Sequence, residues 1–362
     1  MTRIAVVADC HIGNHRQYGA EVVAGINYRC RLALEALRNA LLIADDHKCE
    51  HVVVCGDLFD SSKVEPQVVF ALMTLFSESN ARVHVLCGNH DINSNAPADN
   101  ALSALAFVPN VTVYEGSPRV VDLGVKCLFV PYKNEQGRDY IARAVRGSPD
   151  VAAVFFHAGV SDTNTPAFLK NTQDSIDVDD IEALLGETSA RLFFAGNWHT
   201  TRSWRVKDAR VYQCGTLVPT GYDDQAAAFV HVYDGRTVTK HNAPGPRFWS
   251  FDKLDAKAIA DAALKSTCAF VRCTLPLAEV QSAKDLVEGL LLSTGASVIE
   301  VVPSKREVSE QREAALVDAA RVAREDEVRN AVAAYVHNMP LTASVDRAAL
   351  LSLVMDALDG KT

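Results

Sequence analysis

The chain has 362 residues, 22% of them charged, and a formal net charge of −9 at pH 7. A chain of this length can bury one large core and a smaller appended module. The acidic balance argues against a broad electrostatic surface for a polyanion, but a bound pair of metal ions supplies positive charge locally, where a phosphate sits.

Targeting and redox features are sparse in the sequence. No apolar run approaches the length of a membrane span, and the first residues contain no basic segment followed by a long apolar one. We therefore expect a soluble protein of the cytoplasm, or of the host cytoplasm if a phage encodes it. The nine cysteines are scattered and form no C-x-x-C pair, which predicts small buried side chains rather than a zinc site.

The first part of the chain alternates apolar runs with segments of helical periodicity. Residues 4–9, 51–57 and 81–91 are the expected strands, and residues 29–47 and 65–79 are the expected helices. Strands separated by helical segments predict an α/β architecture with buried sheets.

The middle of the chain holds further apolar runs of strand length. Between residues 111 and 131, three short runs are separated by turn residues, so we expect antiparallel pairing there. Further strands are expected at 151–159, 190–199 and 210–216, and a hairpin at 228–242.

The last part of the chain changes in composition. Residues 253–266 are expected to be helical, and residues 268–303 have a strand–helix–strand pattern, which predicts a small separate module. Residues 304–327 are charged and rich in alanine, typical of a linker or a solvated helix.

Two amphipathic helical stripes close the sequence. One runs from Val328 to Val336 and the other from Leu350 to Leu358, with a break at Asn338-Met339-Pro340. Two interpretations of this helix pair remain open, namely packing against its own domain and docking in the groove of a partner.

Polar side chains follow five of the expected strands, each where the strand ends. The set is Asp9, His11, Asp57, Asp60, Asn89, His90, Asp91, His157, Asn197 and His199. In open α/β sheets, ligands bind at the carboxyl ends of strands. Two divalent cations about 3.5–4 Å apart need a bridging carboxylate with mixed histidine and oxygen ligands, and such a set suits Mn, Fe or Zn better than Ca.

Each of these motifs alone has a simpler interpretation. The GDLFD segment at 56–60 could cap the following helix, the GNHD segment at 88–91 could be a turn, and His157 could be a buried histidine with an ordinary hydrogen-bond partner. The clusters occur in order, each after an apolar strand, and this combination favours a metal site.

The order D-x-H, G-D-x-x-D, G-N-H-D, H and G-x-x-H over residues 1–245 resembles that of the calcineurin-like metallophosphoesterase superfamily. Within it, HIG after the first Asp, GDLFDSS, GNHDIN and CGTLVPTGYDD resemble the SbcD-type DNA repair and recombination nucleases, and they look closest to the nuclease subunit of large-phage recombination complexes. The resemblance implies a four-layer αββα sandwich with a small C-terminal α+β capping module and a terminal helix pair.

The same resemblance implies a division of the chain into three parts. Residues 1–250 correspond to the nuclease domain and residues 251–303 to the capping domain. Residues 304–362 correspond to a linker and a helix pair that binds an SbcC-type coiled-coil ATPase.

The resemblance further implies two divalent metal ions, with Mn²⁺ as the foremost candidate. The first ion is expected on Asp9, His11, Asp57 and His199, with Asp57 bridging, and the second on Asn89, His157 and Asn197. His90 is expected to contact the phosphate and assist the leaving oxygen, with Asp91 orienting its imidazole.

One position departs from the family pattern. Its last motif is usually G-H-x-H, whereas this chain has Gly196-Asn197-Trp198-His199. A neutral amide binds transition metals less well than imidazole, so the departure predicts a weaker second metal site or a preference shifted toward Mn²⁺. A scaffold that binds DNA ends with a decayed metal site, or a phosphatase of the same fold, remains as an alternative.

The activity implied by the resemblance is hydrolysis of phosphodiester bonds in DNA, as an exonuclease on double strands and an endonuclease on single-stranded or structured DNA. A homodimer is implied as well, with residues 65–79 and 99–107 as candidates for its interface, although their apolar faces are equally consistent with core. Lys63, Tyr132 and Lys133 are candidate DNA contacts in loops near the motifs, with ordinary loop positions as the alternative.

Overall fold

The computed structural model describes residues 2–19, 21–94, 100–166, 169–170, 172–224, 227–305, 309, 327, 329–339 and 346–358. The chain divides into two compact units. The first comprises Met1–Cys273 and Leu286–Glu300, and the second comprises Thr274–Asp285 and Val301–Thr362.

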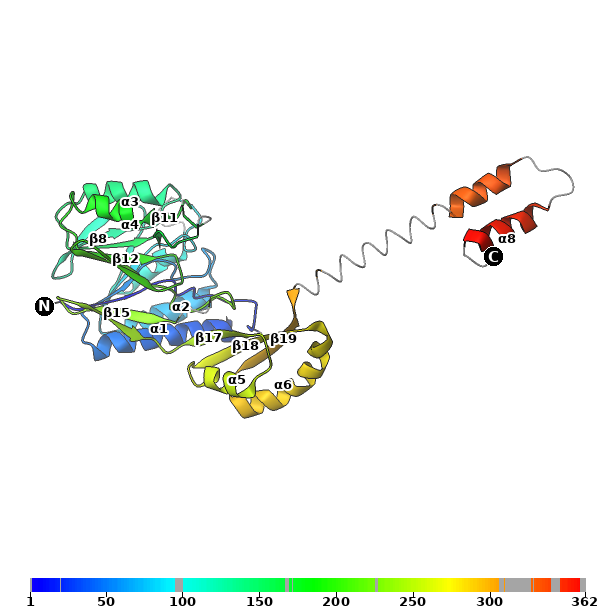
Figure 1. Ribbon diagram of the computed structural model, residues 1–362. Helices are drawn as coiled ribbons and strands as arrows, with labels where there is room; N and C mark the ends of the chain where they lie inside the picture. The colour runs from blue at the N-terminus through cyan, green and yellow to red at the C-terminus, as the bar shows by residue number, and fades with distance from the viewer. Residues whose placement is uncertain are drawn as a thin grey trace. The chain divides into compact units, whose positions relative to one another are not determined.

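Two six-stranded sheets form the centre of the first unit within the described residues (Figure 1). The first sheet has the order β16-β15-β1-β4-β5-β6. Its strands are β1 (Ile4–Val7), β4 (His51–Val54), β5 (Arg82–Leu86), β6 (Val111–Tyr114), β15 (Phe229–Tyr233) and β16 (Val238–Asn242). Strands β1, β4, β5 and β6 run parallel, and β15 joins the free side of β1 antiparallel, pairing Ile4 with Tyr233.

The second sheet has the order β13-β14-β12-β9-β8-β7. Its strands are β7 (Arg119–Asp122), β8 (Lys126–Val130), β9 (Ala153–His157), β12 (Leu192–Gly196), β13 (Arg202–Val206) and β14 (Ala209–Gln213). The four central strands are parallel, and the two edge strands β7 and β13 are antiparallel to their neighbours.

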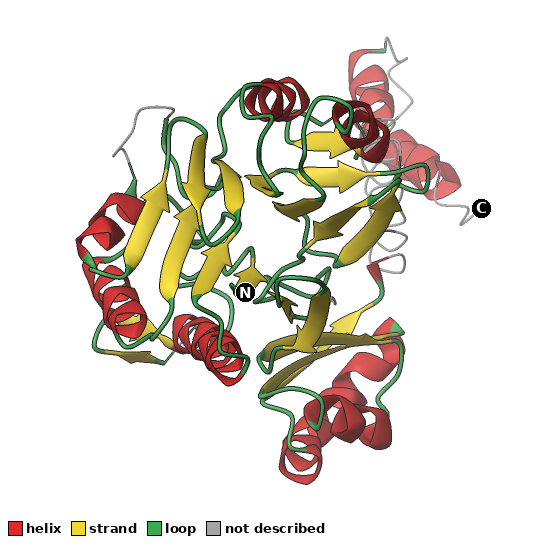
Figure 2. Cartoon of the chain, turned by 90° about the vertical axis from the view of Figure 1, so that its left-hand side faces the viewer, coloured by secondary structure: helices red, strands yellow, loops and turns green. Residues whose placement is uncertain are grey.

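Helices cover the outer faces of both sheets (Figure 2). They are α1 (Tyr28–Asp46), α2 (Pro66–Ser77) and the 3-10 helix η1 (Ala101–Phe107) on the first sheet, and α3 (Gly137–Arg146) and α4 (Val178–Leu184) on the second. The Asn27 side chain caps α1 by accepting from the backbone N–H of Cys30, and Pro66 occupies the first turn of α2, where its missing N–H costs nothing. One core lies under each set of helices and a third lies between the sheets, so the expected four-layer αββα sandwich is confirmed.

Aromatic rings fill the layer between the two sheets. Tyr114, Phe129, Phe155, Phe194 and Tyr212 stack in sequence, with successive ring centroids 4.2 to 5.2 Å apart. Rings of this size bury large apolar areas, so they hold the two sheets in register below the functional site.

A three-stranded sheet follows, in the order β17-β18-β19. Its strands are β17 (Pro246–Phe251), β18 (Cys268–Leu275) and β19 (Val298–Pro303), accompanied by α5 (Ala256–Ala263), η2 (Leu277–Glu279) and α6 (Val280–Thr294). The expected strand–helix–strand pattern is present, and β17 adds a strand parallel to β18. Strand β17 spans the predicted boundary between residues 250 and 251.

The second unit ends in two helices, at residues 329–338 and in α8 (Arg347–Leu358). The Arg347 guanidinium donates hydrogen bonds to the carbonyl oxygens of Val336, His337 and Met339. This side chain therefore satisfies the terminal carbonyls of the preceding helix. The predicted linker is described only in part, because residues 306–308 and 310–326 lie outside the described residues.

Several expectations from the sequence differ from the structure or are incomplete. Between residues 111 and 131, antiparallel pairing holds for β7 and β8 only, because β6 joins β5 in parallel in the other sheet. The short strands β2 (Val22–Val23), β3 (Ile26–Asn27), β10 (Gly159–Ser161) and β11 (Ser175–Asp177) were not foreseen. All nine cysteines are free and buried, as expected. No helix among the described residues is long and apolar enough to cross a membrane.

Candidate metal centre

The polar clusters named from the sequence converge at one edge of the sandwich. Asp9 and Asp57 follow the parallel strands β1 and β4 of the first sheet, and His157 and Gly196 pair directly at the ends of β9 and β12 in the second. Because the carboxyl ends of parallel strands lie at the same edge of a sheet, each sheet contributes part of the site.

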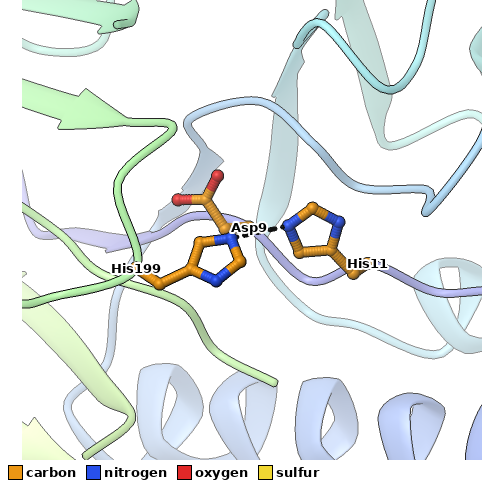
Figure 3. Close-up of side chains that lie close together, drawn as sticks. All are labelled: Asp9, His11 and His199. Atoms are coloured by element: carbon orange, nitrogen blue, oxygen red, sulfur yellow. Dashed lines mark hydrogen bonds between the residues drawn. The ribbon is translucent and has the colours of Figure 1, made fainter. Parts of the chain in front are cut away.

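Asp9, His11 and His199 form the first group of potential ligands (Figure 3). One ligand atom from each lies within 4.8 Å of the others, and the Nε2 atoms of the two histidines are 3.0 Å apart. Burial raises the pKa of the Asp9 carboxyl, although His157 opposes this effect. Two imidazole nitrogens and a buried carboxylate at this spacing are a donor set that fits a divalent transition metal.

Asp9, Asp57 and His157 form the second group. The Nδ1–H of His157 donates to the carbonyl oxygen of Cys55 at 2.7 Å, which directs Nε2 toward Asn89 Oδ1 at 2.9 Å and Asp57 Oδ2 at 3.3 Å. A bare nitrogen lone pair facing two oxygen acceptors is unfavourable, whereas a cation or a proton between them is stabilised. These residues therefore also fit a metal ion.

The electrostatics of this second group point the same way. Burial alone lowers the pKa of His157, but the Asp57 carboxylate and its hydrogen bond outweigh burial and raise the pKa to about 10. Burial alone raises the pKa of Asp57, but His157 and the other histidines hold it well below its usual range. The pocket thus favours positive charge at His157 Nε2, the position that a metal ion would take.

Backbone strain is concentrated in the same residues. Asp9, His11, Asp57 and Asn197 have φ angles of 52°, 44°, 49° and 79°, in the left-handed region. Non-glycine residues in this region cost on the order of 1–3 kcal/mol each and cluster at functional sites. Gly56 also has a positive φ of 88°, and a Cβ there would lie 2.1 Å from His157 Nδ1, so a close backbone approach requires glycine.

His90 lies at the rim of the centre with an exposed side chain. Its ring centroid is 4.9 Å from that of His11, and its backbone N–H donates to Asp57 Oδ1 at 2.9 Å. Its Nδ1 lies 2.9 Å from the carbonyl oxygen of Asp60. The Asp60 carbonyl therefore orients the His90 imidazole.

The structure corrects the role expected for Asp91. Its buried carboxylate accepts hydrogen bonds from the backbone N–H groups of Phe59 and Gly88, at 2.9 and 2.8 Å. Burial and the nearby Asp57 raise its pKa to about 6. Asp91 thus ties together the loops after β4 and β5, and it does not orient the His90 ring.

Two further carboxylates lie beside the candidate ligands, and the sequence predicted neither of these contacts with a histidine. Asp224 Oδ2 accepts a 2.6 Å hydrogen bond from Nδ1 of His199, which directs the Nε2 of that ring toward His11. The Asp60 carboxylate lies 3.5 Å from His11 Nδ1. Partners of this kind fix the orientation of metal-binding histidines. Asp224 lies in the GYDD segment, but nothing in its local pattern indicates a partner 25 residues away.

Asn197 lies between the two groups. Its backbone N–H donates to both oxygens of Asp9, at 3.0 and 3.1 Å, and its side-chain Nδ2 donates to the carbonyl oxygen of Asp174 at 3.0 Å. With Nδ2 so held, Oδ1 is the one side-chain atom that Asn197 can offer to a metal ion.

The three candidate DNA contacts differ in their surroundings. Lys63 is exposed in the loop before α2. The Tyr132 ring makes an edge contact with His157, at a centroid distance of 6.3 Å. The Lys133 ammonium lies 3.9 Å from a Glu135 oxygen and over the Tyr140 ring, so local partners already take up its charge.

Comparisons with known proteins identify a family and several similar solved structures. A family model described as calcineurin-like phosphoesterase matches residues 2–200. No curated protein sequence matches the chain. Similar solved structures include TT1561 of Thermus thermophilus (14% identity, TM-score 0.45, covering 67% of this chain and 99% of that one) and a dimetal phosphatase from Danio rerio (12%, 0.45, 67% and 97%). A novel archaeal phosphodiesterase is a third (13%, 0.36, 67% and 99%).

Proposed function

Because the chain belongs to the calcineurin-like phosphoesterase family, whose members hydrolyse phosphoesters with divalent metal ions, we propose that this protein is a DNA nuclease with two metal ions. The observation that carries the proposal is the convergence of Asp9, His11 and His199 with Asp57 and His157 beside an exposed His90. Divalent ions on this set supply the charge that neutralises a phosphate and lowers the pKa of a water molecule.

The side chains around the metal centre have separate roles in positioning the substrate and the ions. His90 directs its Nδ1 to the Asp60 carbonyl oxygen, so Nε2 is the ring nitrogen left to face the leaving oxygen. Asp224 keeps the His199 ring in place, and Asn89 and Asn197 offer amide oxygens to the second ion. We propose Mn²⁺ as the preferred ion, because oxygen-rich ligand sets favour it over zinc.

The choice of DNA rests on the sequence surrounding the ligands. The GDLFDSS, GNHDIN and CGTLVPTGYDD segments resemble those of SbcD-type repair and recombination nucleases. The exposed position of His90 leaves the reacting phosphate accessible to a polymer. We accordingly propose exonuclease action on double strands and endonuclease action on single-stranded or structured DNA.

An end-labelled linear duplex in Mn²⁺ tests this function. We expect cleavage by the wild type, loss of cleavage in His90→Ala, and retained cleavage in His47→Ala, a matched change at the end of α1. Bis(p-nitrophenyl) phosphate and p-nitrophenyl phosphate, assayed in parallel, separate diesterase from monoesterase activity. If the protein hydrolyses the monoester but leaves DNA uncut, it is a phosphatase and the nuclease proposal is wrong. If it hydrolyses none of the substrates, a DNA-end-binding scaffold is favoured.

We also propose two partners. The terminal helices expose Tyr335 and Leu353, at 70% and 60%, which supports docking on an SbcC-type coiled-coil ATPase.

Phe70 of α2 and Phe107 of η1 are 72% and 84% exposed on elements that contact each other, which supports a homodimer through this face. Sedimentation of Phe70→Glu tests the dimer: we expect monomers, and an unchanged mass would rule out this interface.

A further inference from the structure

A second cavity opens between two hairpins, one from each sheet. It has a volume of about 630 Å³, and its walls are the β13–β14 hairpin of the second sheet and the β15–β16 hairpin of the first. Arg202 and Arg210 line one wall, and Arg236 and Lys240 line the other. We call this cavity the flank groove.

The charge of the flank groove is opposite to that of the whole protein. The chain carries a net charge of −9, yet none of the twelve residues that line the groove is acidic and four are arginine or lysine. Within the described part of the chain, Arg202 has one carboxylate near it, an Asp162 oxygen at 3.8 Å, and no ion pair is present for Arg210 or Arg236. A concave surface lined by several cations and no acidic residue favours an anionic ligand.

The spacing of the cations indicates the kind of anion. Arg202 lies opposite Gln213 and Arg205 lies opposite Arg210 in the β13–β14 register. Arg202 and Arg210 are therefore separated by three strand positions, or roughly 10 Å, and their side chains lie on opposite faces of the hairpin. The cations are thus spread along the groove, which suits a ligand that carries several phosphates along a chain.

The flank groove shares a lining residue with a cavity beside the metal centre. A smaller cavity of about 330 Å³ is lined by Asn197, Trp198 and His199, and Arg202 lines both this cavity and the flank groove. Trp198 offers an aromatic ring of the kind on which bases stack. Arg202 thus lies beside both the flank groove and the cavity that contains candidate metal ligands.

A buried donor is present in the groove as well. His231 lines it, is 2% exposed, and has no hydrogen-bond partner for its Nδ1 among the described residues. Burial and the neighbouring Lys240 lower its pKa to about 4, so the ring is neutral near pH 7. With Nδ1 buried and unpaired, the favoured tautomer carries its proton on Nε2, which can donate to a phosphate oxygen.

We propose that the flank groove binds the sugar–phosphate backbone of the nucleic-acid strand whose cleavable phosphate lies at the metal centre. Arg210 and Lys240 contact successive phosphates on opposite walls, and Arg202 links this segment to the reacting phosphate. The inference rests on the proposed function, since it assigns a binding surface to the same substrate.

Strand binding by the full chain, measured in EDTA so that nothing is cut, tests the groove. The pair Arg210→Ala/Lys240→Ala is compared with Lys257→Ala/Lys265→Ala, which removes the same charge from exposed positions at α5. For a labelled single strand of about 30 nucleotides, we expect about tenfold weaker binding by the groove variant alone, and a salt dependence shallower by about 1.4 in the log–log slope.

The outcomes separate the two proposals. If the wild type cuts DNA but the groove variant binds the long strand as the control does, the groove assignment is wrong and the nuclease stands. If inorganic tripolyphosphate binds the wild type tightly and the groove variant weakly, while the DNA strand binds both equally, the groove is instead a site for small anions. If the wild type neither binds nor cuts DNA, the proposed function fails first and the groove assignment fails with it.

Discussion

The Nε2 atoms of His11 and His199 lie 3.0 Å apart, although 188 positions separate the two residues in the chain. His11 follows the first strand of one sheet and His199 follows β12 of the other. The contact therefore joins the carboxyl ends of both sheets, and a metal ion held there connects the two halves of the sandwich.

Removal of one of these nitrogens should abolish stabilisation by metal. A ligand at a hundred times its Kd adds about 2.7 kcal/mol to the free energy of unfolding, so Mn²⁺ should raise the Tm of the wild type by several degrees. We expect His199→Ala to lose this shift and His47→Ala to keep it, as measured by calorimetry with and without Mn²⁺. An equal shift in His199→Ala would show that Mn²⁺ binds elsewhere.

The carboxylate behind His199 should control metal affinity without being a ligand. Asp224 accepts the Nδ1 hydrogen bond of His199 at 2.6 Å, and loss of such a partner typically costs 10- to 100-fold in metal affinity. We expect this loss in Asp224→Asn, measured by titration calorimetry with Mn²⁺. Asp223→Asn changes the same residue type one position earlier, at an exposed side chain, and should bind Mn²⁺ normally. Equal affinities for the two variants would contradict the orienting role.

Restoring imidazole at position 197 should strengthen the second metal site. Histidine tolerates the left-handed backbone that Asn197 adopts at φ 79°, so the change is compatible with the fold. We expect Asn197→His to bind the second ion about tenfold or more tightly, with the largest gain for Zn²⁺. Metal content after dialysis against limiting metal measures this, and an unchanged stoichiometry and affinity would exclude position 197 from the ligand set.

The position of the Trp198 indole should require glycine at residue 159. A Cβ on Gly159 would lie 2.1 Å from Trp198 Cε2, so Gly159→Ala must displace the indole that lies between Asn197 and His199. We expect a loss of about 1–3 kcal/mol in unfolding free energy together with weaker metal binding. Gly186→Ala meets no atom within 4 Å and should leave both quantities close to wild type.

Acid should destabilise the protein through its buried histidines. Burial, with His51 and Arg82, lowers the pKa of His84 from 6.5 to about 4. The unfolded chain therefore binds a proton below pH 6.5 that the folded chain rejects until about pH 4, so stability falls as the pH decreases through this window. The loss for His84 amounts to at most about 3 kcal/mol.

Urea unfolding at pH 7 and pH 5 measures this effect. We expect a smaller decrease in stability between the two pH values in His84→Gln than in the wild type, whatever the stability of the variant at pH 7. An identical decrease in both proteins would assign the acid sensitivity to other groups, with His231 as the next candidate because its pKa is also lowered to about 4.

The convergence of the candidate ligands was predictable because the ends of parallel strands lie at one edge of a sheet. Asp9 and Asp57 lie just after apolar strands and His157 ends one, and parallel strands bring such positions to one edge. The parallel pairing of β6 was not predictable in the same way, because its short run resembles those of β7 and β8 and the sheet it joins is set by tertiary contacts.

The supporting contacts were harder to foresee. Asp91 occupies the position expected of a catalytic partner, but its carboxylate is bound by the backbone of Phe59 and Gly88, a contact that sequence cannot reveal. Asp224 reaches His199 from a loop without any periodic pattern. Likewise the flank groove is built from residues on two hairpins in different sheets, and it becomes visible only when the sheets are placed.

The pairing of β1 with β15 has a consequence for synthesis of the chain on the ribosome. Ile4 emerges first, yet its partner Tyr233 is made only after every candidate metal ligand up to His199. Until then one edge of β1 stays open, and open strand edges promote aggregation. We therefore expect nascent chains to carry the full ligand set before the sheet that positions Asp9 and His11 is closed.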